Sequence, residues 1–79
     1  MTITVKFFAS LRERLGKADV AIETTGVVTV AEVWAQATAG APFPPNTLAA
    51  VNMDYAGPHG AVRDGDEVAF FPPVTGGSP

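Results

Sequence analysis

The chain opens with an alternation of apolar and polar side chains over residues 2–8. The apolar set on one face consists of Ile3, Val5 and Phe7. A period of two is typical of a strand with one buried face, so this segment predicts a first strand. Residues 19–23 alternate in the same way, with Val20 and Ile22 on one face, and predict a second strand that returns beside the first.

The pattern changes to helical spacing after the second strand. Thr29 and Glu32 have the spacing of a capping box, which marks the start of a helix. The apolar stripe that follows, at positions i, i+3, i+4 and i+7, consists of Val30, Val33, Trp34 and Ala37. A shorter helical turn is expected at Ser10–Leu15, between the two strands, with Ser10 as its N-cap and Gly16 at its end.

The second half of the chain reads as three more strands. The main helix is expected to end at Gly40, and residues 41–46 contain three prolines, which favour a connecting loop. Residues 48–51 predict a short apolar strand, residues 52–54 suit a turn, and Tyr55 is expected to open a brief edge strand. The alternation over residues 67–71 predicts the last strand.

This order of elements is strand, strand, helix, strand, short strand, strand. It predicts an α+β fold of the β-grasp type, with a mixed sheet of about five strands and one main helix packed on one face. Residues 1–73 are assigned to this domain. Residues 74–79 are assigned to a flexible C-terminal tail, because small polar residues and glycine cannot be held by burial.

Composition narrows the chemistry that this domain can perform. The 79 residues fit a single small domain, and the absence of cysteine excludes thiol and disulfide chemistry. A net charge of −3 disfavours nucleic acid and anionic membranes as partners, since both select for clustered Lys and Arg. The chain shows neither a leader pattern nor the roughly 20 apolar residues of a membrane span, so we expect a cytoplasmic protein.

The tail contains two adjacent glycines, Gly76 and Gly77. A terminus without side chains can thread a narrow channel and present a carboxylate to another active site. If a partner adenylates that carboxylate, a sulfur nucleophile can attack it to form a thiocarboxylate. The alternative is that the two glycines are only a frayed end, as chain termini often are.

Three aromatic side chains are expected to point away from the core. Phe8 falls on the polar face of the first strand, and Phe71 falls on the outward face of the last strand beside the tail. The first and last strands are neighbours in a β-grasp sheet, so Phe8 and Phe71 should form one patch that Tyr55 extends. The alternative is that each is an ordinary exposed apolar residue.

Other residues that could act in catalysis or metal binding are expected to have structural roles instead. His59 stands alone in a GPHG loop and is expected to be a solvated residue, with no metal-binding role. Asp64 and Asp66 fit a turn, with Glu67 after it, better than a metal or acid–base site. Trp34 is expected in the core. The sequence has no phosphate-binding or nucleophile-elbow motif, so catalysis is expected from partners.

The segments KFFASLRERLG, LAAVNMDY and DGDEVAFFPPVTGG resemble the MoaD family of the ubiquitin-like MoaD/ThiS superfamily, the small subunits of molybdopterin synthase. The resemblance spans the chain and is most specific over residues 64–77, while residues 24–46 match only in pattern. It implies that a MoeB-like, ubiquitin-activating-type adenylyltransferase uses ATP to adenylate Gly77. The terminus then becomes a thiocarboxylate that gives its sulfur to the molybdopterin dithiolene in a MoaE-like large subunit.

The resemblance also implies which residues meet the partners. Gly76 would line the channel of the large subunit, and no cofactor is implied for the chain itself. The implied partner-binding residues are Phe8, Tyr55, Phe71, Pro72, Pro73, Val74 and Thr75. The family often has an aliphatic residue at the position of Tyr55.

In the family the second glycine is the last residue, whereas here Ser78 and Pro79 follow Gly77. A glycine in a peptide bond cannot be adenylated, so a processing peptidase is expected to remove the two residues. The alternatives are an inactive copy and residues added by engineering. Two other functions also stay open: a sulfur carrier for thiamine, cysteine or tRNA thiolation, and a binding module whose tail stays uncleaved.

Overall fold

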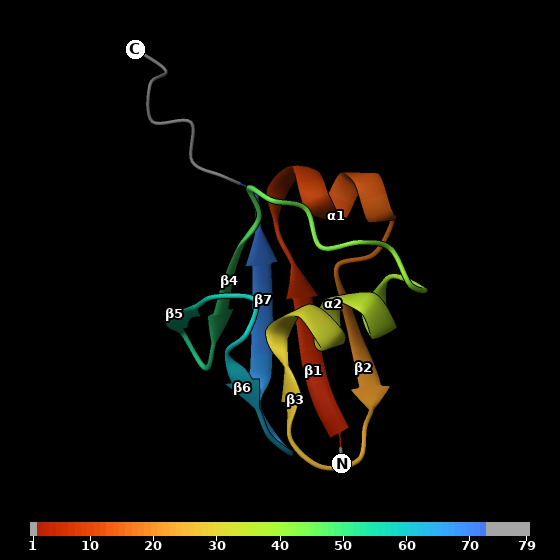
Figure 1. Cartoon of the computed structure of the whole chain (residues 1–79). Helices are drawn as coiled ribbons and strands as arrows, with labels where there is room; N and C mark the ends of the chain where they lie inside the picture. Colours follow the sequence, from red (N-terminus) through yellow and green to blue (C-terminus); the bar gives the residue numbers. More distant parts are fainter. Residues whose placement is uncertain (1, 73–79) are drawn as a thin grey trace.

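A mixed five-stranded sheet forms the centre of the fold (Figure 1). The computed structural model describes residues 2–72. In spatial order the strands are β2 (Asp19–Glu23), β1 (Thr2–Phe7), β7 (Glu67–Phe71), β4 (Leu48–Val51) and β5 (Asp54–Ala56). The central pair, β1 and β7, is parallel, and the other pairs are antiparallel. The predicted mixed sheet, and the pairing of its first and last strands, are confirmed.

The main helix, α2 (Val30–Ala37), covers one face of this sheet (Figure 1). The Thr29 hydroxyl accepts from the Glu32 N–H at 3.1 Å, and the Glu32 carboxylate accepts from the Thr29 N–H at 2.7 Å, so the predicted capping box is confirmed. All four residues of the predicted apolar stripe are buried. The helix ends at Ala37, earlier than expected, and the Gly40 N–H, at φ 91°, donates to the Ala35 carbonyl.

The short helix, α1 (Ala9–Leu15), begins earlier than the sequence predicted. Its N-cap is Phe8, and Ser10 lies inside the helix, so the prediction of Ser10 as N-cap is wrong. The reason is that β1 runs directly into the helix: the Phe8 N–H still donates to the Phe70 carbonyl of β7 at 3.1 Å. Gly16 ends the helix in the left-handed conformation, as predicted.

A second, two-stranded sheet was not predicted. It pairs β3 (Val28–Thr29) with β6 (Ala61–Val62) in antiparallel fashion. Two-residue strands are too short to show an alternation, so the sequence carries no periodic signal for them. Val62 is fully buried, so this small sheet completes the core beneath the start of α2.

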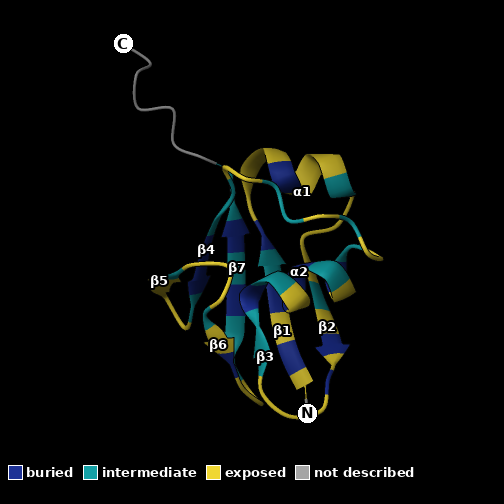
Figure 2. Ribbon diagram, in the orientation of Figure 1, coloured by how far each residue is buried: buried dark blue, intermediate teal, exposed yellow. Residues whose placement is uncertain are grey.

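The core lies between the five-stranded sheet and the two helices, where buried residues concentrate (Figure 2). Its aromatic centre is Trp34, whose ring meets Phe7, Phe43 and Phe70 edge-on at centroid distances of 5.0–5.8 Å. The indole N–H of Trp34 donates to the Pro42 carbonyl at 3.1 Å, so its one polar atom is satisfied. The prediction that Trp34 is a core residue is confirmed.

Hydrogen bonds tie the turn before β7 to the β4–β5 hairpin. The Asp66 carboxylate accepts from the Arg63 backbone N–H at 2.8 Å and from the Asn52 side-chain amide at 2.9 Å. These bonds stabilise the charged form and lower the pKa of Asp66. The Asn52 side-chain carbonyl in turn accepts from the Glu67 N–H at 3.0 Å. The predicted turn role of Asp66 is therefore confirmed, and the hairpin is fixed to β7.

Candidate docking surface

The sheet face opposite the helices presents the side chains that alternate with the core. On β7, Val68 and Phe70 are fully buried against the helices, so Glu67, Ala69 and Phe71 lie on the opposite face. The register places a row of residues across this face, with each residue opposite the next on the neighbouring strand. The row consists of Lys6, Ala69, Ala50 and Tyr55.

A shallow groove of about 370 Å³ occupies this face. Strands β1, β7, β4 and β5 and the turn between β4 and β5 contribute its lining. The lining residues are Lys6, Phe8, Ala50, Met53, Tyr55, Glu67, Ala69 and Phe71. Most of this lining is apolar, although the face lies outside the core. We call this set of residues the docking surface.

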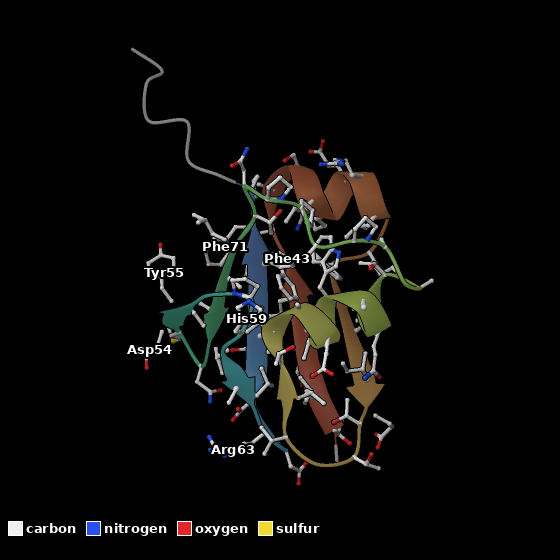
Figure 3. The ribbon with its side chains drawn as sticks, in the orientation of Figure 1. Phe43, Asp54, Tyr55, His59, Arg63 and Phe71 are labelled. Atoms are coloured by element: carbon white, nitrogen blue, oxygen red, sulfur yellow. The ribbon has the colours of Figure 1, made fainter. Side chains whose placement is uncertain are left out.

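The three predicted aromatic residues come together on the docking surface. Phe71 is in the middle, with ring centroids 6.0 Å from Phe8 and 6.0 Å from Tyr55. Phe8 is 46% exposed and Tyr55 is 78% exposed, whereas Phe71 is half-buried. Figure 3 shows Tyr55 and Phe71 on the β4–β5 side of the molecule, away from Arg63. The prediction of one aromatic patch is confirmed as geometry.

Alanines form the floor between these rings. Ala50 is only 6% exposed, yet it does not belong to the cluster of core residues. Since Ala50 and Ala69 are opposite each other in the sheet, their small side chains leave the space that the groove occupies. An apolar side chain from another molecule would find an apolar floor there.

One ion pair borders the groove. Lys6 Nζ lies 3.2 Å from a Glu67 carboxylate oxygen, and both side chains are 42% exposed. The two opposite charges largely cancel, so the rim of the docking surface has polar character without a net charge. Such a rim around an apolar floor is the usual anatomy of a protein interface.

The docking surface lies where β7 ends and the tail begins. Phe71 is the last residue of β7, and Pro72, the last residue that the structure describes, is half-buried beside it. The other tail residues predicted to act lie outside the described residues. These are Pro73, Val74, Thr75, Gly76 and Gly77.

The prediction of this surface from the sequence did not include Lys6, Ala50, Met53, Glu67 and Ala69, of which Met53 is the most exposed. Met53 was expected only as part of a turn, yet it lines the groove and is 90% exposed.

His59, outside the docking surface, lies exposed in the β5–β6 loop. Across residues 2–72, no three His, Asp or Glu side chains form a group that could hold a metal ion, and no helix is long and apolar enough to cross a membrane.

The chain is similar in sequence to a known protein family and to named proteins. The ThiS family matches residues 5–77, which include both tail glycines. A molybdopterin synthase sulfur carrier subunit from Escherichia coli is 39% identical, over 95% of this chain and 99% of that protein. The protein of that name from Haemophilus influenzae is 34% identical over the same shares of the two chains.

Solved structures show the same fold. SAMP1 from Haloferax volcanii superposes with a TM-score of 0.81 at 27% identity, covering 98% of this chain and all of that one. A putative molybdopterin converting factor, subunit 1, from Pyrococcus furiosus superposes with a TM-score of 0.73 at 26% identity, covering 94% and 99% of the two chains. Both likenesses cover the sheet and the helices, so the β-grasp prediction is confirmed.

Proposed function

The chain belongs to the ThiS family, and from this premise we propose that it is the sulfur carrier subunit of a molybdopterin synthase. The observation that carries the proposal is the family match through Gly77, together with an apolar docking surface at the base of the tail. The chain acts as a carrier subunit, and catalysis belongs to a MoaE-like large subunit and to a MoeB-like activating enzyme.

The length of the tail limits how far Gly77 can reach from the docking surface. Gly77 is five residues beyond Pro72, so it extends at most about 18 Å from Pro72. A partner that binds Phe8, Tyr55 and Phe71 therefore has its active site within this radius. The same surface serves the activating enzyme and the large subunit in turn, since both act on the same terminus.

The chemistry of the terminus needs a free carboxylate. The activating enzyme transfers AMP from ATP to the Gly77 carboxylate and releases pyrophosphate. A sulfur donor then displaces AMP, and the resulting thiocarboxylate gives its sulfur to the molybdopterin precursor held by the large subunit. Gly77 is joined to Ser78 by a peptide bond and has no free carboxylate in the 79-residue chain. A peptidase must therefore remove Ser78 and Pro79 first.

The acceptor of the sulfur distinguishes this proposal from other sulfur-carrier roles. Carriers for thiamine, cysteine or tRNA thiolation would use the same terminus, and a binding module would not use it. The molybdopterin assignment is supported by the names of the curated relatives, which align over 95% of the chain.

The test uses three forms of the protein: the chain ending at Gly77, the same chain with Gly77→Ala, and the 79-residue chain. Each is mixed with the cognate activating enzyme and ATP, and pyrophosphate release is measured. We expect release with the chain ending at Gly77 and none with the 79-residue chain. Release with Gly77→Ala should be lower by about tenfold or more, because a methyl group displaces the reacting carboxylate. Equal release from all three forms would contradict the proposal.

A further inference from the structure

The β4–β5 hairpin contains a residue whose backbone and side chain conflict. The loop has two residues, Asn52 and Met53, between the paired residues Val51 and Asp54. Their φ angles are 50° and 73°, and a two-residue hairpin loop with both angles positive is a type I′ turn. The second position of this turn favours glycine, because a β-carbon is disfavoured in the left-handed region.

Asn52 has a structural reason to occupy its position. Asparagine tolerates positive φ, and its side chain joins Asp66 and the Glu67 N–H. Met53 has no such reason, because its side chain makes no hydrogen bond among the described residues and is 90% exposed. The other non-glycine residues with positive φ in residues 2–72 besides these two are Ala9 and Ala39. Met53 is thus the one large apolar side chain held in this conformation there.

The exposed side chain of Met53 reaches the docking surface. Met53 and Tyr55 are two residues apart and both line the groove, on the side opposite Lys6 and Phe8. The hydrogen bonds of Asn52 fix the hairpin to β7, so Met53 is held at the groove. A flexible thioether is suited to fill irregular apolar spaces in a partner.

We propose that Met53 is a partner-contact residue of the docking surface, kept at a glycine position because its side chain binds the large subunit of molybdopterin synthase. This inference rests on the proposed function and extends it to a residue outside the aromatic patch. A glycine would make a better turn, and a polar residue would make a better solvent-exposed loop. A partner that binds the Met53 side chain accounts for both its positive φ angle and its exposure.

The test measures the affinity of the 79-residue chain and its variants for the cognate large subunit, by calorimetry or surface plasmon resonance. We expect Met53→Gly to weaken binding about fivefold or more, through faster dissociation. The urea-unfolding midpoint of this variant should stay the same or rise, because glycine relieves the turn. Met53→Leu keeps an apolar side chain of similar volume and should bind within about twofold of the parent.

Two control variants separate the possible failures. Val27 is 60% exposed and lies outside the groove, so Val27→Ala should leave the affinity unchanged. Phe71→Asp places a charge at the centre of the aromatic patch and should weaken binding strongly. If Phe71→Asp weakens binding and Met53→Gly does not, the inference about Met53 is wrong and the docking surface stands. If neither weakens binding, the docking surface itself is wrong.

Discussion

At the scale of single residues, the alternation of β7 gives two neighbouring phenylalanines different environments. Phe70 is fully buried against Trp34, and Phe71 lies on the opposite face between Phe8 and Tyr55. A shift of the strand by one residue would exchange them and place a core side chain in solvent. The hydrogen bonds of Asp66 and Asn52 at the start of β7 act against such a shift.

The same network predicts how stability depends on pH. Backbone and side-chain hydrogen bonds lower the pKa of Asp66 below its ordinary value of 3.8. Because the unfolded chain then takes up the proton first, the stabilisation is complete at neutral pH and is lost as pH falls below about 4. Asp66→Asn replaces one acceptor oxygen with a donor and should cost about 1 kcal/mol at pH 7.

Urea unfolding at neutral and at acidic pH checks this prediction. The loss of stability on acidification should be smaller in Asp66→Asn than in the parent chain, because the titrating group is gone. Asp54→Asn is the control, since Asp54 is exposed and its side chain has no hydrogen bond among residues 2–72. An identical loss on acidification in Asp66→Asn and in the parent would contradict the assignment.

At the scale of elements, the main helix and the longer strands are predictable from the hydrophobic periodicity of the sequence. Features that depend on contacts between distant segments were missed. The capping box and the apolar stripe predict α2. The alternation in β1 and β7 predicts that Phe8 and Phe71 point away from the core, where their rings are in contact. The pair β3–β6 is too short for a period, and the N-cap of α1 follows from a β1–β7 hydrogen bond that no local pattern contains. Met53 was missed because a turn pattern gives no direction to its side chains.

The capping box of α2 offers a direct test at this scale. Thr29→Ala removes the hydroxyl that accepts from the Glu32 N–H, and it should destabilise the protein by about 1 kcal/mol. Urea unfolding measures the change. Thr25→Ala is the matched control, because Thr25 is exposed and makes no hydrogen bond among the described residues. Equal effects of the two substitutions would show that the capping hydroxyl contributes nothing.

At the scale of the whole molecule, the fold separates two tasks. The helices, the small sheet and one face of the main sheet form the core, and the groove lies on the other face. The chain leaves the domain beside that groove, at Phe71 and Pro72. A partner held by the docking surface therefore receives the terminus at a limited distance, while the folded domain needs no catalytic group of its own.

In the proposed function, Gly77 becomes a sulfur-bearing terminus. The most direct test is intact-protein mass spectrometry of the protein isolated from its own host, which reads both the last residue and the replacement of oxygen by sulfur. We predict a chain that ends at Gly77, with a fraction that carries one sulfur in place of one oxygen. A mass that retains Ser78 and Pro79 in every molecule would contradict the claim.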